Sequence, residues 1–142
     1  MAIFKDYLEN KSPLILHGAL GTEMESLGYD ISGKLWSAKY LLEKPEVIQK
    51  IHETYVAAGS DLITTSSYQA TLPGLLDAGL TKEEAEQIIA LTVQLAKDAR
   101  DKVWATLDET EKAKRPYPLI SGDVGPYAAY LANGSEYTGD YG

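Results

Sequence analysis

Polar groups that could hold a small molecule stand at two places in this sequence, each directly after a short apolar run. His17 follows Pro13-Leu14-Ile15-Leu16 and precedes the turn Gly18-Ala19-Leu20-Gly21-Thr22. The second group comprises Thr65, Ser67, Tyr68 and Gln69. Imidazole, hydroxyl and amide groups bind polar ligands through hydrogen bonds, and small residues let backbone amides approach a ligand closely. These residues predict a binding site for a small polar molecule, without a catalytic carboxylate pair.

The composition excludes several other functions. The chain has no cysteine and only two histidines, so it has neither disulfides nor a thiol nucleophile and cannot build a Cys/His metal cage. Its net charge of −8 would repel a phosphate backbone, which argues against a nucleic-acid partner. No apolar run approaches the roughly 20 residues that span a bilayer, and the start lacks a signal peptide. We expect no membrane association and a cytoplasmic location.

The first half of the chain predicts one strand–helix–strand unit. Residues 13–17 form a short apolar run that ends at a glycine turn, which is typical of a buried parallel strand. A glycine-rich polar stretch, predicted as loop, leads to Pro45. From there apolar residues recur at helical spacing as far as Gly59. Residues 61–66 mix β-branched and apolar residues and predict the second strand.

The second half predicts a long helix and a third strand. Thr81 and Glu84 form a capping box ahead of an apolar stripe that reaches Val103. Residues 108–115 are a charged connector, interpreted as a solvated helix end and loop, and Leu119-Ile120-Ser121 predicts a strand. The segment after Gly122 has no period and is predicted as loop.

Alternating strands and helices indicate an α/β fold with a parallel sheet and right-handed crossovers, either doubly wound or a barrel. A (β/α)₈ barrel needs ~250 residues and eight βα units, and this chain supplies fewer than half of these units. We therefore expect residues 1–142 to be one part of a single domain, with an unpaired sheet edge at the third strand.

Four strings at the predicted loops together resemble the homocysteine S-methyltransferase family, in its zinc-dependent, S-methylmethionine-using form. They are Gly18 to Glu23, Leu35 to Ala38, Ser67 to Thr71, and Gly125-Pro126-Tyr127 with Tyr130 to Tyr137. Each string alone is a weak signal, but four in order are specific. The resemblance implies that the chain is the amino-terminal part of a (β/α)₈ TIM barrel with its site at the carboxyl ends of the strands.

The resemblance also implies the chemistry. Its substrates would be homocysteine and a methyl donor, with the sulfonium S-methylmethionine favoured over S-adenosylmethionine or the quaternary ammonium betaine. Its cofactor would be one Zn²⁺ held by three thiolates near the carboxyl terminus. Those cysteines are absent from this chain. A thiol with a pKa near ~8.5 is mostly protonated at neutral pH, and zinc coordination removes its proton. We therefore expect the intact parent to transfer methyl groups and this chain alone to be inactive.

The resemblance assigns substrate-binding roles but places no catalytic or metal-binding residue in this chain. The expected binding residues are His17, Gly18, Ala19, Leu20, Trp36, Thr65, Ser67, Tyr68, Gln69 and Tyr127. His17 stands where the family usually has Asp. It either accepts a hydrogen bond from the substrate or is a strand-end residue satisfied by neighbouring backbone.

For three other residues a structural role is weighed or expected. The Trp36 indole either packs as a plug or faces a cationic donor, and the resemblance favours the donor. Asp123 is expected to cap a turn. His52 is expected to be solvated or packed at the helix rim, without a function.

Two other functions stay open. In one, the turn Gly18 to Thr22 cradles an anion at a helix start, in a small α/β binding module. In the other, the chain is a non-catalytic fragment that self-associates through its open sheet edge.

Overall fold

The computed structural model describes residues 5, 7–9, 13–32, 36–131 and 133–141. After the amino-terminal segment its elements are α2 (Leu20–Ser26), the 3₁₀ helix η1 (Trp36–Ala38), α3 (Lys39–Glu43), α4 (Pro45–Ala58), β1 (Leu62–Thr64), α5 (Leu72–Asp77), α6 (Lys82–Thr106), α7 (Glu109–Lys112), β2 (Leu119–Ser121), α8 (Tyr127–Leu131) and α9 (Ser135–Thr138). The chain is thus an α/β protein, as the alternation of its sequence predicts.

The strands lie in a parallel sheet in their sequence order. β1 pairs with β2 in the register Leu62 with Leu119 and Thr64 with Ser121. On the other side of β1, Leu16 forms a parallel bridge to Leu62, and the backbone N–H of His17 donates to the Leu62 carbonyl at 2.8 Å. Neighbours in space are therefore neighbours in sequence, as in successive βα units. The strand predicted over 13–17 is present only as this bridge, and that predicted over 61–66 is regular over 62–64.

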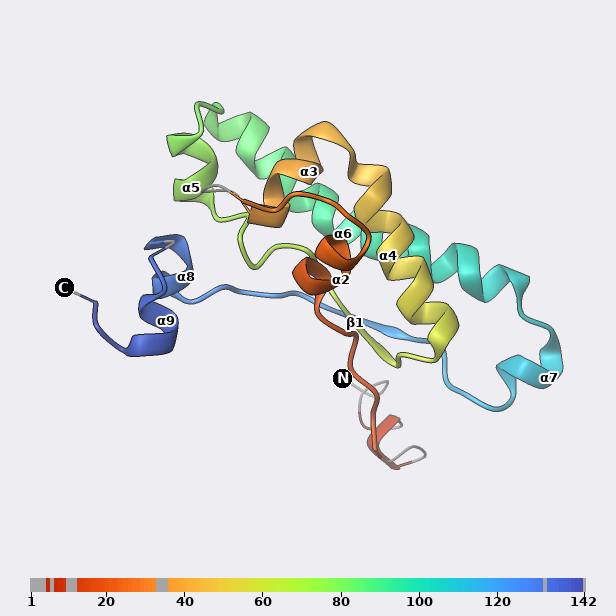
Figure 1. Ribbon diagram of the computed structural model, residues 1–142. Coiled ribbons are helices and arrows are strands. Elements are labelled where there is room, and N and C mark those ends of the chain that lie inside the picture. The colour runs from red at the N-terminus through yellow and green to blue at the C-terminus, as the bar shows by residue number, and fades with distance from the viewer. Residues whose placement is uncertain (1–4, 6, 10–12, 33–35, 132, 142) are drawn as a thin grey trace.

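Helices α3, α4, α5 and α6 lie on one side of the strands (Figure 1). Ile63 in β1 is fully buried against this helix layer with Val56 and Ala96, and the partly buried Val103 and Ile120 pack against them. A larger apolar cluster between α4 and α6 includes Ile48 and Leu75. Because burial of such a side chain contributes about 1.5–3 kcal/mol, these contacts hold the helix layer on the sheet.

The two long helices begin and end where the sequence predicts. Pro45 occupies the first turn of α4, and Gly59 ends it with a φ of 107°, a left-handed conformation that glycine adopts without strain. At the start of α6, the Thr81 hydroxyl accepts from the Glu84 N–H at 3.2 Å, and the Glu84 carboxylate accepts from the Thr81 N–H at 2.8 Å. The predicted capping box is confirmed.

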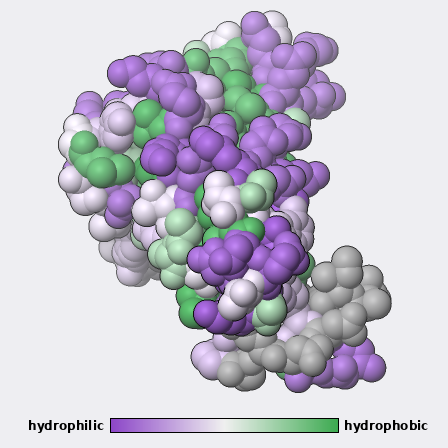
Figure 2. Space-filling view, turned by 90° about the vertical axis from the view of Figure 1, so that its right-hand side faces the viewer, coloured by the Kyte–Doolittle hydropathy of each residue, from purple (hydrophilic) through white to green (hydrophobic). Residues whose placement is uncertain are grey.

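One side of the molecule is mostly hydrophilic (Figure 2). Figure 2 shows one side of the molecule, where hydrophilic residues cover most of the surface and small hydrophobic areas lie between them. Among the described residues, no helix is both long and apolar enough to cross a membrane.

The opposite face of the sheet carries Leu16, Leu62 and Leu119, which are paired across the strands. Their side chains point away from Ile63 because successive residues of a strand face opposite sides. Leu16 is 58% exposed, and neither Leu62 nor Leu119 is fully buried. Parallel sheets are ordinarily covered on both faces. The helix layer covers the face that carries Ile63 but not the face that carries these leucines.

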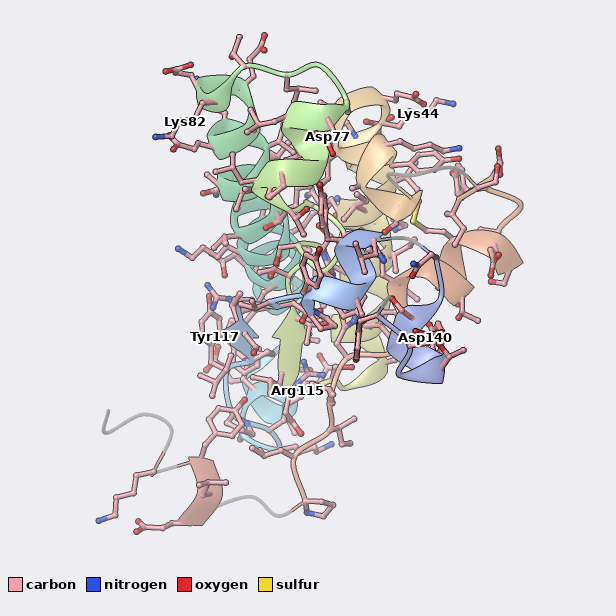
Figure 3. All side chains as sticks on the ribbon, turned by 90° about the vertical axis from the view of Figure 1, so that its left-hand side faces the viewer. Lys44, Asp77, Lys82, Arg115, Tyr117 and Asp140 are labelled. Carbon is pink, nitrogen blue, oxygen red and sulfur yellow. The ribbon has the colours of Figure 1, made fainter. Side chains whose placement is uncertain are left out.

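Two loop predictions are wrong. The stretch between Gly18 and Pro45 contains α2 and α3, and the segment after Gly122 contains α8 and α9. These helices are four to seven residues long, too short to show a helical period in the sequence. Tyr130 of α8 donates a hydrogen bond to Asp77 of α5 at 3.0 Å, a contact between distant segments. Figure 3, which labels Asp77, shows α8 and α9 in front of the strands.

Candidate functional site

A cavity of about 550 Å³ lies at the carboxyl ends of the strands. It is lined by Leu16, His17, Gly18, Ala19, Leu20, Gly21, Thr22, Glu25, Ile31, Ser37, His52, Thr64, Thr65, Ser66, Tyr68, Gln69, Asp123 and Tyr137. The lining therefore comes from the segments that follow all three strand positions. The carboxyl ends of parallel strands are where α/β enzymes place their ligands.

Two histidines face each other at the back of this cavity. His17 Nε2 lies 2.8 Å from His52 Nδ1, and His17 Nδ1 lies 3.4 Å from the Thr64 hydroxyl. His17 is 6% exposed and His52 is completely buried. His52 Nε2 is buried without a hydrogen-bond partner among the described residues. The expectation that His52 is solvated or at the rim is wrong, because the helix face that carries it packs against the end of the first strand.

Burial favours the neutral form of both imidazoles. It lowers the pKa of His52 from 6.5 to about 3, with a smaller contribution from the neighbouring charge of His17. The pKa of His17 is also lowered by burial, against a hydrogen bond with the Gly18 backbone that favours the protonated ring. A neutral imidazole has one donor and one acceptor nitrogen, so the two rings can share a single hydrogen bond without repulsion.

The turn after His17 lies directly against Tyr55 of α4. The Tyr55 hydroxyl donates to the Ala19 carbonyl at 3.2 Å, and its ring lies 4.3 Å from the His17 ring between centroids. A Cβ atom at Gly18 would be 2.4 Å from the Tyr55 ring. Only glycine fits at this position, so Tyr55 fixes the path of the backbone that lines the cavity.

A closed ring of hydrogen bonds ties the loop after β1 to the loop after β2. The Asp123 N–H donates to Thr65 Oγ1 at 2.9 Å, and Ser67 Oγ donates to the Asp123 carbonyl at 2.6 Å. Thr65 and Ser67 are joined at 2.7 Å between their hydroxyl oxygens. Because the Ser67 hydrogen is used on a carbonyl, Thr65 donates to Ser67. Both hydroxyl hydrogens are therefore engaged within the protein.

Gly125 completes this loop contact. A Cβ atom at Gly125 would lie 2.2 Å from the Tyr68 carbonyl oxygen, so the two backbones approach as closely as glycine permits. Tyr68 is 37% exposed and, with Gln69, borders the cavity. This packing explains why the chain has a glycine at position 125.

Most of the predicted binding residues come together around the cavity. His17, Gly18, Ala19, Leu20, Thr65, Tyr68 and Gln69 line it, whereas Ser67 and Tyr127 are not among the lining residues. Tyr127 is 68% exposed, and its ring lies beside that of Tyr130 at 6.0 Å. The Trp36 backbone belongs to η1, but its side chain lies outside the described residues.

Sequence reasoning gave no binding role to several polar residues that line the cavity, among them Glu25, Ser37, His52, Thr64, Ser66 and Tyr137. Ser37 and Tyr137 belong to strings quoted above, which was a usable signal. His52 lies 35 residues from its partner His17, and nothing in the sequence joins the two.

The described residues do not fit a bound zinc ion. They contain no group of three His, Cys, Asp or Glu side chains placed to hold a metal. The two histidines direct Nε2 of one ring and Nδ1 of the other at each other, and the 2.8 Å between these nitrogens is too short for a metal to bridge.

The chain is thus an α/β protein whose parallel βα units place polar loops around a cavity at the strand ends, the geometry of a small-molecule-binding site. The sequence profile of the family described as homocysteine S-methyltransferase matches residues 14–141. The chain belongs to this family.

Named relatives agree. The chain is 46% identical over 128 residues to homocysteine S-methyltransferase YbgG of Bacillus subtilis, covering 90% of this chain and 40% of the relative. It is 42% identical over 134 residues to homocysteine S-methyltransferase of Escherichia coli, covering 94% of this chain and 42% of the relative. The crystal structure of Escherichia coli homocysteine methyltransferase MmuM in its metallated form superposes with a TM-score of 0.85 at 41% identity, covering 98% of this chain and 46% of that one. The chain thus spans less than half the length of these relatives.

Proposed function

We propose that this chain supplies the amino-acid-binding loops of a homocysteine S-methyltransferase. The reaction transfers a methyl group from a sulfonium donor, S-methylmethionine or S-adenosylmethionine, to homocysteine and yields methionine. The single observation that carries the proposal is the convergence of family strings on one cavity. Gly18 to Gly21, Tyr68 with Gln69, and Tyr137 come from three separate strings and line it together.

The chemistry needs a thiolate and a donor held in line. A new bond forms between the homocysteine sulfur and the methyl carbon, the bond from that carbon to the sulfonium sulfur breaks, and the thiol proton leaves before attack. Positioning of this kind can supply about 7–11 kcal/mol of the barrier. The cavity offers carboxylates at Glu25 and Asp123 for the substrate ammonium, and small residues at Gly18 and Ala19 for backbone contact.

We propose that the residues of this chain do not bind the zinc ion of the family reaction. The Escherichia coli structure is described as metallated, which supports a metal in the family reaction. Because this chain has no cysteine and its histidines bond to each other, we assign the metal to the part of the family domain that the chain does not match. We propose that the chain alone does not catalyse methyl transfer.

The architecture supports an incomplete barrel. The strands are parallel and adjacent in sequence order, the helices cover one face, and Leu16 lies exposed on the other. We infer that residues 1–142 are the amino-terminal βα units of a (β/α)₈ barrel whose remaining strands cover that face. The cytoplasmic location stays a prediction that suits amino-acid substrates.

A second candidate is self-association of the chain through the same face or through the edge of β2. Exposed Leu16 favours it, since a second copy could cover the leucines. An anion-binding module draws less support, because Glu23 in the first turn of α2 disfavours a negatively charged ligand. Sedimentation velocity across a hundredfold concentration range separates a monomer from a self-associating chain.

Binding of homocysteine to the chain tests the proposal. Isothermal titration with L-homocysteine should give saturable binding, and L-norvaline, which carries a methyl group in place of the thiol, serves as the matched ligand. A Gly125→Ala variant should weaken binding of homocysteine because its Cβ would displace the Tyr68 backbone, whereas Gly122→Ala, which meets no atom within 4 Å, should not. Equal binding by both variants would contradict the placement of the site.

A further inference from the structure

His52 is a buried polar side chain that the proposed reaction leaves unused. It lies on α4, completely buried, with Nδ1 2.8 Å from His17 Nε2 and Nε2 without a partner among the described residues. One hydrogen must lie between the two rings. It belongs either to His52 Nδ1 or to His17 Nε2, and the two arrangements leave different groups unsatisfied.

The unpartnered Nε2 of His52 distinguishes the two possible positions of this hydrogen. If His17 Nε2 carried the hydrogen, His52 would hold its own hydrogen on Nε2, and a buried N–H donor would be left without an acceptor. If His52 Nδ1 carries it, Nε2 is only an unused lone pair. Buried orphan N–H groups are rarer in proteins than under-used acceptors. The second arrangement is therefore favoured, although it puts His52 in the less common neutral form with hydrogen on Nδ1.

The position of this hydrogen sets which nitrogen of His17 faces Thr64 as a donor, and Thr64 lines the cavity. With Nε2 as acceptor, a neutral His17 holds its hydrogen on Nδ1, which lies 3.4 Å from Thr64 Oγ1. The Thr64 oxygen then accepts beside the Gly18 backbone, to which the His17 ring also bonds, and the hydrogen of the Thr64 hydroxyl is free to point into the cavity that Thr64 lines. The charged side chains of that lining, Glu25 and Asp123, are carboxylates and can only accept when ionised.

We propose that His52 is a positioning residue: its Nδ1–H donates to His17, which fixes His17 as a donor to Thr64 and makes the Thr64 hydroxyl a hydrogen-bond donor to the carboxylate of the bound amino acid. The Tyr55 ring, 4.3 Å from His17, holds the imidazole in this orientation. This role for Thr64 rests on the proposed function, since it presumes an amino-acid ligand. The arrangement of the two histidine rings is independent of the proposed function.

The ring arrangement is measurable directly. The chain has only two histidines, so a long-range ¹H–¹⁵N spectrum of the labelled chain at pH 7.5 contains two imidazole patterns, assigned with a His52→Asn variant. We expect both rings neutral with the hydrogen on Nδ1. A His52 pattern with the hydrogen on Nε2 would overturn the proposal, whatever the chain binds.

Variants test the positioning role. His52→Asn keeps an N–H donor near the Nδ1 position and should preserve the Nδ1–H form of His17, whereas His52→Leu should convert His17 toward the Nε2–H form. Loss of the Nδ1–H form in both variants, or its retention in both, would contradict the role of His52. The wild-type spectrum decides the ring arrangement even if His52→Leu does not fold.

Ligand binding tests the role of Thr64. Thr64→Val should weaken binding of L-homocysteine roughly tenfold, the range for a hydrogen bond to a charged group, and Thr64→Ser should not. Neither change should alter binding of 3-aminopropane-1-thiol, which lacks the carboxylate. Equal weakening of both ligands by Thr64→Val, or none, would refute the donor role. If the wild-type chain binds neither ligand, the proposed function fails and with it the role of Thr64, while the spectrum still decides the rings.

Discussion

Lowering the pH from 7 to 5 should destabilise the folded chain by about 2 kcal/mol through His52 alone. In the unfolded chain His52 titrates at its ordinary pKa of 6.5, whereas burial lowers its pKa in the fold to about 3. Between these values the unfolded state binds a proton that the folded state does not. Stability is therefore fully present above pH 6.5 and is lost as the pH falls toward 3.

His17 adds to this loss, because burial lowers its pKa as well. The carboxylates with lowered pKa values contribute at more acidic pH. The pKa of Asp30 is held at about 2 mainly by its hydrogen bonds to Ser32, and the pKa of Glu53 is lowered mainly by a hydrogen bond from Lys102, against its burial. The window from pH 7 to pH 5 thus reports chiefly on the two histidines.

The assay is urea unfolding followed by circular dichroism at pH 7 and pH 5. A His52→Asn variant removes the titrating group, so its loss of stability between the two pH values should be about 2 kcal/mol smaller than that of the wild type. If the wild type and the variant lose the same stability, burial does not keep His52 neutral in the fold, and the reasoning is refuted.

Three further changes test the local structure. Gly18→Ala should destabilise the fold by about 1–3 kcal/mol in urea unfolding, since its Cβ would lie 2.4 Å from the Tyr55 ring, whereas Gly122→Ala should be nearly neutral; similar values for the two would contradict the close packing. Ser67→Ala should cost about 1 kcal/mol, because it opens the ring of hydrogen bonds between the loops after β1 and β2; faster amide hydrogen exchange at Asp123 would report the opening, and unchanged exchange would count against it. Thr81→Ala should cost about 1 kcal/mol and fray the first turn of α6, and full helicity with unchanged stability would show that the cap is dispensable.

The parts of the fold that sequence reasoning predicted are those with local signals. Pro45 and Gly59 bound α4 because their backbone preferences act at their own positions. Thr81 and Glu84 start α6 by bonding to each other across three residues. Helix α8 shows no such signal, since its buried Ala128 and Ala129 span less than two turns and its contact to Asp77 is remote in sequence.

Sequence reasoning predicted the site residues that lie in loops after strands. It did not predict those that reach the site through packing between distant segments. The glycine turn after His17 and the polar string at Tyr68 follow strands, and parallel strands bring their ends together. The pairing of His17 with His52 is a contact between a strand end and a helix face, which no local pattern encodes. Similarly, Thr65 and Ser67 carry hydroxyls suited to a ligand, but their hydrogens are used within the protein.

The most direct test of the central claim is methyl transfer by a hybrid enzyme. Residues 14–141 of this chain would replace the matching segment of Bacillus subtilis YbgG, to which the chain is 46% identical, and the purified hybrid would be assayed with zinc, homocysteine and S-methylmethionine. We expect the hybrid to form methionine and this chain alone to form none. A cooperatively folded hybrid without activity would contradict the claim that these residues form the amino-acid-binding half of the site, and turnover by the chain alone would contradict the claim that the other half is required.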